Sequence, residues 1–386
     1  MCIRDRLDAC HDRGIRVILD GVFNHASRGF FQFNDILENG KQSPWIDWFT
    51  VTGSPLNPYQ TDRTHNYRAW WNNPALPKFN TDHPPVRDYL FEVIEHWTKQ
   101  GIDGWRLDVP NEIKTRGFWE EFRSRVRSIN PDAYLVGEVW GNATKWITKG
   151  DRFDAAMNYT FAGKTLAFVA GDRIDPQLGK GVDYPIKPAV DASEYATAVH
   201  RLLSLYPEHA NRSNFNLLGS HDTARALTVA AGDVDSVVLA ALLMFTFPGT
   251  PCVYYGDEVG MSGGKDPGSR GAFPWDRPES WNTELLDAYR RLISLRHAHP
   301  ALRHGTYRPL PAAPGSHLHA FFREIAGETL FVAVNAGEEA VSASIPDTPT
   351  GPSFETIWGI GEVTPGDDGM WVALPPRSGA VWKVPE

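Results

Sequence analysis

The sequence of 386 residues predicts an α/β fold, in which strands alternate with helices, followed by an antiparallel all-β region. Three observations lead to this prediction. Apolar strand-like runs alternate with amphipathic helical patterns up to about residue 302. Hydrophobic residues make up 42% of the chain, which is ample for a packed core. From about residue 303 the pattern changes to short strands separated by turns. We therefore expect two domains, residues 1–302 and 303–386.

The first strand is predicted in IRVILD, residues 15–20, after the end of a helix and a glycine turn. Residues 84–97 then carry apolar side chains at helical spacing behind two prolines, which suit a first helical turn. The strand GIDGWRLDV follows. Three more pairs of helix and strand are predicted: 118–129 with AYLVGEVW, 195–206 with FNLLGSHD, and 237–247 with PCVYYG. This alternation is typical of a parallel sheet with helical crossovers.

Two regions depart from the alternation. Residues 26–84 form a connection rich in Trp, Asn and Pro that is longer than ordinary loops. At the other end, RHGTYRPLPAAPG is interpreted as a junction, and His317 and His319 are expected at the surface of a strand. The C-terminal strands are predicted in HAFFREI, TLFVAVN, VSASIP, MWVALP and GAVWKV.

Composition and charge exclude several classes of protein. The net charge is -9, with Lys+Arg 38 against Asp+Glu 47, and no basic run could follow a phosphate backbone, so a nucleic-acid partner is not expected. No apolar stretch approaches the roughly 20 residues of a membrane span. Cys2, Cys10 and Cys252 fit no disulfide or metal pattern. The N-terminal segment has no apolar core of the signal-peptide kind, and we expect a cytoplasmic location.

Each predicted strand of the α/β region ends in polar side chains. In a closed barrel of parallel strands these ends converge on the face that carries the chemistry. Arg106 and Asp108 also share one face of their strand, where pairing would hold the carboxylate ionised. A structural ion pair is the alternative for this pair alone. The polar residues at the strand ends are Asp20, Asn24 and His25; Arg106 and Asp108; Glu138; His221 and Asp222; and Tyr255, Asp257 and Glu258.

Converging carboxylates and histidines suit two kinds of chemistry. A metal centre is the first, yet no HxxxH, HExxH or comparable ligand spacing is present. A glycosidase is the second, because it needs one carboxylate as nucleophile and one carboxylic acid as proton donor, held roughly 5 Å apart in retaining enzymes. A third carboxylate could stabilise positive charge on the sugar in the transition state.

Four stretches in order, DGVFNH (20–25), GWRLDVPNE (104–112), GEVW (137–140) and LLGSHD (217–222), resemble the signature regions of the α-amylase family, glycoside hydrolase family 13. The resemblance implies a (β/α)8 TIM barrel in which IRVILD is the third strand, so that the first two βα units are missing from this sequence. It further implies that residues 26–84 are a small domain inserted after that strand, and that residues 303–386 are a C-terminal antiparallel β-sandwich.

By the same resemblance, Asp108 is the nucleophile, Glu138 the general acid/base and Asp222 the transition-state stabiliser. Apolar neighbours are expected to keep Glu138 protonated until it donates its proton. The expected substrate-binding residues are Arg106, His221, His25, Asp20 and, as an aromatic ring for sugar stacking, Trp140.

Further stretches, ALPKFN (75–80), VPNE, GTPCVYYGDEVGM (249–261) and DPGSRGAFPWD, resemble the neopullulanase, cyclomaltodextrinase and maltogenic amylase group. This implies cleavage of α-1,4-glucosidic bonds in cyclodextrins, maltodextrins, pullulan or starch through a covalent glycosyl-enzyme intermediate. A transglycosylase or sugar isomerase, and a non-catalytic glucan-binding relative, stay open as alternatives. No cofactor is required. Calcium near Asn24 and a homodimer, both found among family members, are left open.

Overall fold

The computed structural model describes residues 3–59, 65–179, 186, 190–346, 348, 354–366 and 369–384. Cys2 therefore lies outside the described residues. The chain divides into two compact units. The first unit is Met1–Val139 with Ala143–Ala156, and the second unit is Trp140–Asn142 with Met157–Glu386.

A sheet of short parallel strands organises the first unit. Asp20 lies opposite Arg106, and Leu107 lies opposite Gly137. The carboxyl ends of the strands therefore meet at one edge, as the sequence predicted for the segments around residues 20, 106 and 138. The strands lie in the order β1 (Ile18–Gly21), β2 (Gly104–Leu107), β3 (Tyr134–Gly137) and β4 (Ala155–Ala156), of which β4 was not predicted.

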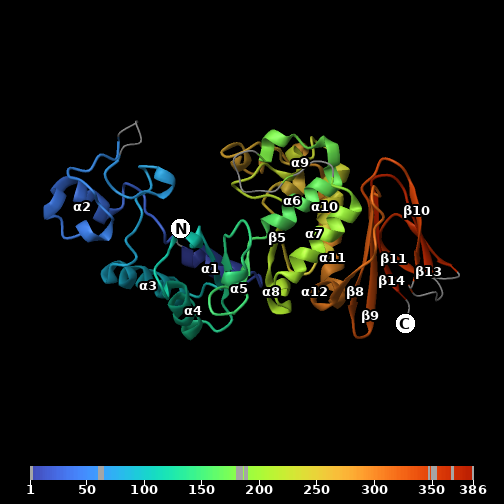
Figure 1. Cartoon of the computed structure of the whole chain (residues 1–386), viewed down its shortest axis with the longest axis horizontal. Helices are drawn as coiled ribbons and strands as arrows, with labels where there is room; N and C mark the ends of the chain where they lie inside the picture. The colour runs from blue at the N-terminus through green and yellow to red at the C-terminus, as the bar shows by residue number, and fades with distance from the viewer. Residues whose placement is uncertain are drawn as a thin grey trace. The chain divides into compact units, whose positions relative to one another are not determined.

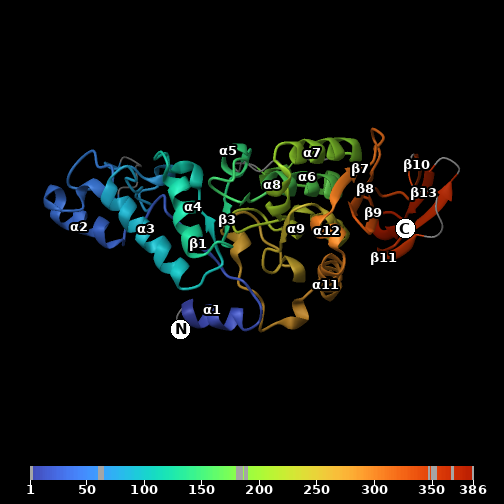
Figure 2. The ribbon, with the colours of Figure 1, turned by 90° about the horizontal axis from the view of Figure 1, so that it is seen from below.

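Two amphipathic helices, α3 (Pro84–Lys99) and α4 (Phe118–Ile129), pack side by side in this unit (Figure 2). Both were predicted from their apolar spacing, and α3 begins with the two prolines at its first turn. The ring of Phe122 contacts Trp105 of β2, so α4 covers the sheet with its apolar stripe. The remaining helices of the unit are α1 (Ile3–His11), α2 (Phe31–Asn39), α5 (Thr144–Ile147) and the 3-10 turn η4 (Pro110–Glu112).

The long connection between β1 and α3 has an aromatic core of its own. Phe33 of α2 lies 5.1 Å from Phe49 and 5.0 Å from Tyr67 between ring centroids. Isolated β-bridges, including one between His25 and Lys78, tie the connection back to the segment that follows β1. Its 3-10 turns are η1 (Gly40–Gln42), η2 (Ile46–Trp48) and η3 (Trp70–Asn72).

The second unit contains the parallel pair β5 (Phe215–Leu217) and β6 (Thr250–Cys252), and helix α6 (Tyr159–Ala170) contacts both β5 and α10 (Val234–Thr246) (Figure 1). No helix in the described part of the chain is both long and apolar enough to cross a membrane. The helices of this unit are α6 (Tyr159–Ala170), α7 (Ala192–Ser204), α8 (Glu208–Ser213), α9 (Ala226–Val229), α10 (Val234–Thr246), α11 (Thr283–Ala298) and α12 (Pro300–His304), with the 3-10 turns η5 (Gly171–Arg173), η6 (Pro176–Gly179), η7 (Asp257–Val259), η8 (Gly268–Arg270) and η9 (Pro278–Ser280).

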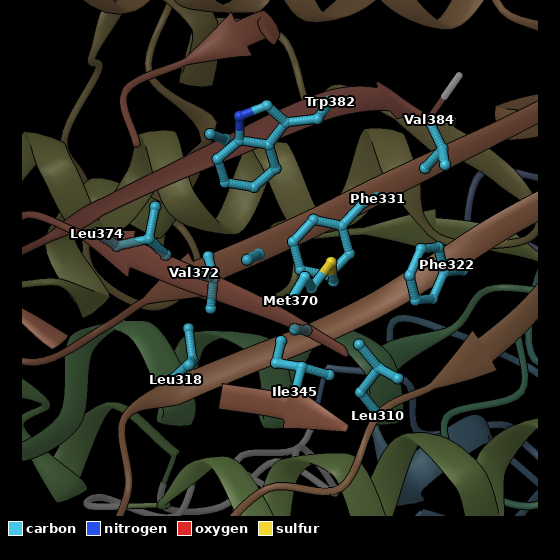
Figure 3. Packing of buried hydrophobic residues seen from close by; sticks show 13 residues of the cluster. Leu310, Leu318, Phe322, Phe331, Ile345, Met370, Val372, Leu374, Trp382 and Val384 are labelled. Atoms are coloured by element: carbon cyan, nitrogen blue, oxygen red, sulfur yellow. The ribbon is translucent and has the colours of Figure 1, made fainter. Parts of the chain in front are cut away.

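Two antiparallel sheets complete the second unit, as predicted for the C-terminal region. Side chains from both sheets, among them Phe322, Phe331, Val372 and Trp382, form one buried core (Figure 3). The five-stranded sheet has the order β11 (Glu355–Gly359), β14 (Ser378–Val384), β9 (Glu328–Asn335), β8 (Leu318–Ile325) and β7 (Thr306–Pro309), and the three-stranded sheet has the order β10 (Val341–Pro346), β13 (Gly369–Leu374) and β12 (Glu362–Gly366).

Two expectations about this region were wrong in part. The segment interpreted as a junction contains β7, which pairs with β8. His319 is not at the surface, because its side chain is completely buried, whereas His317 is exposed as predicted. The reason is that helix α7 packs on β8, and the ring of Tyr195 from that helix lies 5.0 Å from the imidazole. Burial lowers the pKa of His319 to about 3.

Candidate active site

Arg106, near the end of β2, contacts three carboxylates of the first unit. Its Nη1 lies 2.9 Å from Oδ1 of Asp20 and 2.9 Å from Oδ1 of Asp108, and its Nη2 lies 2.7 Å from Oε1 of Glu138. The register explains this meeting, because the three acids stand at the ends of neighbouring parallel strands. The sequence predicted that Arg106 pairs with Asp108, but it did not predict that the same guanidinium also contacts Asp20 and Glu138.

The charges of this cluster do not balance. Burial alone would lower the pKa of Arg106, but the charges of Glu138, Asp20 and Asp108 together raise it above its usual value. Arg106 is therefore a permanent cation. One cation among three carboxylates leaves an excess of negative potential when all three are ionised, which favours a ligand or transition state that carries positive charge.

Glu138 is the most deeply buried of the three acids, with 3% of its side chain exposed, against 17% for Asp108 and 54% for Asp20. The backbone N–H of Val109 donates to its Oε2 at 3.3 Å. Glu138 therefore combines deep burial with contacts to the Arg106 guanidinium and to this N–H.

The chain turns sharply between Asp108 and the 3-10 turn η4. Val109 adopts a left-handed conformation with φ 33 and ψ 53, although it is β-branched and precedes a proline, which normally favours an extended conformation. Such conformations cost about 1–3 kcal/mol and cluster at functional sites. The turn directs the N–H of Val109 to Glu138. Nothing in the sequence signals this strain, since only the φ angle reveals it.

His25 lies beside Asp108, whose charge acts on its imidazole. Its Nδ1 accepts a hydrogen bond from the Asn24 amide at 3.2 Å, and its ring stacks on Trp70 with centroids 4.9 Å apart. Burial lowers the pKa of His25, and the charge of Lys78 lowers it further, while Asp108 opposes both. The imidazole is therefore neutral at neutral pH, with its proton on Nε2.

The surroundings of Asn24 bear on the calcium option. Asn24 is fully buried, and its Oδ1 has no hydrogen-bond partner within the part of the chain that the structure describes. Amide oxygens are among the ligands that calcium takes. Calcium near Asn24 stays a prediction, for which this buried oxygen is one candidate ligand.

The predicted pair His221 and Asp222 lies in the second unit, in the loop after β5. Nε2 of His221 is 3.1 Å from Oδ2 of Asp222, and Nη2 of Arg270 is 2.9 Å from its Oδ1. The hydroxyl of Ser269 donates to the carbonyl of His221 at 2.9 Å, so the two loops are fastened together. Arg270 lies in the stretch DPGSRGAFPWD, but the sequence did not predict its contact with Asp222.

A buried ion pair supports this loop. Arg225 and Asp257 are almost fully buried, with Nη1 and Oδ1 3.0 Å apart, and the guanidinium also lies 4.6 Å from the ring centroid of Tyr254. Burial raises the pKa of Asp257, and Arg225 limits the rise. Asp257 was predicted as one of the polar strand ends, and its partner indicates a structural role.

Trp140, predicted to bind sugar, belongs to the second unit and stacks on Tyr159, with ring centroids 4.0 Å apart and planes 6° from parallel. One face of its indole is therefore covered by protein. Asp20, His25, Arg106, Asp108 and Glu138 are brought together within the first unit. His221 and Asp222 contact each other within the second unit.

Carboxylates at the carboxyl ends of parallel strands, steadied by an arginine, define a carboxylate-based enzyme site of the α/β type. Residues 3–283 match the model of the alpha amylase catalytic domain, and the chain therefore belongs to the alpha-amylase family. This confirms the resemblance inferred from the four signature regions.

The chain is also similar to individual members of the family. The chain is 44% identical to a cyclomaltodextrinase of Bacillus sp, over 86% of this chain and 56% of that protein, and 41% identical to neopullulanase 2 of Thermoactinomyces vulgaris, over 89% and 56%. Among solved structures, the debranching enzyme of Nostoc punctiforme is 48% identical, with a TM-score of 0.93 over 99% of this chain and 78% of that one. The chain spans about half the length of the curated relatives it matches.

Proposed function

We propose that the protein is a retaining glycoside hydrolase that cleaves α-1,4-glucosidic bonds in cyclodextrins, maltodextrins, pullulan or starch. One observation carries the proposal: Asp108 and Glu138 are held by the two terminal nitrogens of a single guanidinium. Both carboxyl groups thus border the same cation, and a double displacement needs two carboxyl groups roughly 5 Å apart. The names of the relatives support the substrate class.

In the proposed reaction, Asp108 attacks the anomeric carbon while Glu138 gives its proton to the glycosidic oxygen, so that the C–O bond breaks and a glycosyl ester forms on Asp108. Glu138, now ionised beside Arg106, then takes a proton from water, and the resulting hydroxide displaces Asp108 from the sugar. The anomeric configuration is retained. Arg106 and the N–H of Val109 stabilise the anionic form of Glu138 between the two steps.

Asp222 is proposed as the stabiliser of positive charge on the sugar, and this role rests on its signature region. His221, His25, Asp20 and Trp140 are proposed to bind the substrate on the same ground. Residues 26–84 are proposed as an inserted small domain, and residues 303–386 as a C-terminal β-sandwich domain. A cytoplasmic location is supported by 37% identity to the intracellular maltogenic amylase of Bacillus subtilis, over 76% of this chain and 46% of that protein. The homodimer stays a prediction for sedimentation analysis.

The direct test is hydrolysis of β-cyclodextrin by the wild type and by Asp108→Asn, Glu138→Gln and Asp222→Asn. Each substitution should lower kcat by at least about 1000-fold, since each removes a group that acts in the transition state. The control is Asp132→Asn, an exposed acid just before β3, which should leave kcat unchanged. Full activity of Asp108→Asn would overturn the proposal.

NMR spectra recorded during the first turnovers test the stereochemistry, because a retaining enzyme releases the α-anomer first. Early release of the β-anomer would exclude the proposed intermediate. With maltose as sole substrate, longer or rearranged sugars as main products would identify a transglycosylase or isomerase instead. Binding of maltodextrin without turnover would identify a non-catalytic glucan-binding protein.

A further inference from the structure

Three aromatic rings stack in series in the first unit. The ring centroids of His25 and Trp70 are 4.9 Å apart with planes 5° from parallel, and those of Trp70 and Trp71 are 4.7 Å apart with planes at 14°. Trp71 ends the series, and 83% of it is exposed to solvent. The stack thus runs from a residue beside Asp108 out to an open indole.

The backbone at Trp71 has a conformation that residues other than glycine rarely adopt. Trp71 has φ 49 and Asn72 has φ 57, so two consecutive non-glycine residues take the left-handed conformation. The outcome is that a large apolar side chain faces water, where it gains little from the hydrophobic effect. Strain combined with an exposed tryptophan indicates a binding function more readily than a structural one.

The segment that carries the two tryptophans is held firmly. Within it, the N–H of Trp70 donates to the carbonyl of Leu76 at 3.0 Å, and that of Lys78 donates to the carbonyl of Arg68 at 2.9 Å. Its other edge accepts a bond from Ala26, one residue after His25, at 2.9 Å. The indoles are therefore fixed relative to His25 before any ligand arrives, which reduces the entropy lost on binding.

We propose that Trp70 and Trp71 form a platform on which a glucose ring of an α-glucan stacks, with Trp71 offering its open face to the sugar. The C–H groups on a pyranose face match a flat apolar ring. The stack leads from His25 through Trp70 to Trp71, so the platform would bind a glucose of the same chain that lies beyond the immediate neighbour of the reacting sugar. This inference rests on the proposed function, because it extends that site toward a longer oligosaccharide.

The test uses binding, with turnover removed by Asp108→Asn. Maltoheptaose is titrated into this variant and into the double variants that add Trp71→Gly, Trp71→Phe or Phe31→Ala, and the Kd is measured by calorimetry. Glycine is chosen because it takes a positive φ without strain, so the segment between Arg68 and Lys78 can keep its shape. Phe31 is the matched control, since it is an aromatic residue of the same unit that is 67% exposed.

Trp71→Gly should raise the Kd for maltoheptaose about tenfold, the effect of losing one aromatic contact. Trp71→Phe should restore most of the affinity, and Phe31→Ala should leave it unchanged. Maltose, which is too short to occupy the reacting site and the platform fully, should lose less than maltoheptaose. An unchanged Kd in Trp71→Gly, or an equal loss in Phe31→Ala, would overturn the platform.

The outcome for the platform is separate from that for the proposed function. If the wild type hydrolyses maltoheptaose and Trp71→Gly binds it normally, only the platform is wrong. If the wild type binds without hydrolysis and Trp71→Gly binds weakly, the platform stands and the hydrolase proposal falls. If the wild type does not hydrolyse maltoheptaose and Asp108→Asn does not bind it, both are overturned. The urea midpoint of Trp71→Gly, which should not fall, shows that a loss of binding does not reflect unfolding.

Discussion

At the scale of single residues, Arg106 determines whether the acids of the first unit can coexist. Asp20, Asp108 and Glu138 all lie within 2.9 Å of its guanidinium nitrogens, and the arginine side chain is only 13% exposed. Without that cation, the carboxylates would repel one another or take up protons. The planar shape of the guanidinium matters as well as its charge, because its two terminal nitrogens contact acids from three strands.

We therefore predict that Arg106→Lys keeps the charge but loses most of the activity. A single ammonium cannot reach all three acids, so we expect kcat on β-cyclodextrin to fall at least about 100-fold, and the free energy of unfolding in urea to fall by about 3 kcal/mol. Arg125→Lys is the matched control, since Arg125 also pairs with two acids, Glu95 and Glu121, on the exposed surface of α4. It should cost less than about 1 kcal/mol. Equal losses for the two variants would contradict this account.

A second residue-scale prediction concerns the strain at Val109. Val109→Ala and Val109→Gly both remove the valine side chain, but only glycine relieves the φ of 33. The glycine variant should therefore be more stable than the alanine variant by about 1 kcal/mol, the reverse of the usual order. Urea unfolding of the two proteins measures the difference. If alanine is the more stable, Val109 is not strained in solution.

At the scale of elements, the sequence predicted most of the helices that precede a strand and missed α6 and β4. Helices α3 and α4 have a buried stripe and a polar face, which gives the 3.6-residue period. Helix α10 was predicted although most of its residues are buried, whereas the similarly buried α6 was missed. Strand β4 has only two residues and leaves no pattern.

The candidate site also combines contacts that could be predicted from the sequence with contacts that could not. Asp20, Arg106, Asp108 and Glu138 could be predicted to meet, because each follows an apolar strand and the ends of parallel strands converge. The contact between Arg270 and Asp222 could not, because a loop 48 residues away supplies the arginine. The exposed indole of Trp71 depends on a positive φ that no local pattern requires. Long-range loop contacts and unusual backbone angles therefore could not be predicted from the sequence.

The burial of His319 between β8 and α7 leads to a prediction about pH. The pKa of His319 is lowered to about 3 in the folded protein, against an ordinary 6.5, so the unfolded chain takes up the proton first as the pH falls. This contribution to stability is complete above about pH 6.5. It is lost between pH 6.5 and pH 3, by up to about 1.4 kcal/mol per pH unit.

Urea unfolding at pH 7.5, 6, 5 and 4 tests this prediction. His319→Phe removes the group that titrates, so its stability should fall less steeply with pH than that of the wild type. It also loses the 2.9 Å hydrogen bond with the Tyr307 hydroxyl, and should be less stable at pH 7.5. His317→Gln, at an exposed position, should keep the slope of the wild type. Identical slopes for all three proteins would refute the role of His319.

At the scale of the whole molecule, a buried cation connects the C-terminal sheets of the second unit to its helices. Arg323 of β8 is completely buried and donates to the carbonyls of Thr246, Gly305 and Thr306. Thr246 is the last residue of α10, so the positive charge lies at the negative end of that helix. Burial and, to a smaller extent, the charge of Arg296 lower the pKa of Arg323 to about 9, so the side chain stays charged at neutral pH.

We therefore predict that the helices and the C-terminal sheets of the second unit unfold together. Arg323→Leu leaves three carbonyls without this donor and should reduce the free energy of unfolding by about 3 kcal/mol. Hydrogen exchange in urea should show α10 and β9 losing protection at the same denaturant concentration, with both transitions shifted equally in the variant. Arg308→Leu, which removes the 43% exposed partner of Glu324, should shift neither by more than about 1 kcal/mol. A variant in which β9 opens early while α10 keeps its wild-type midpoint would show that the sheets are an independent folding unit.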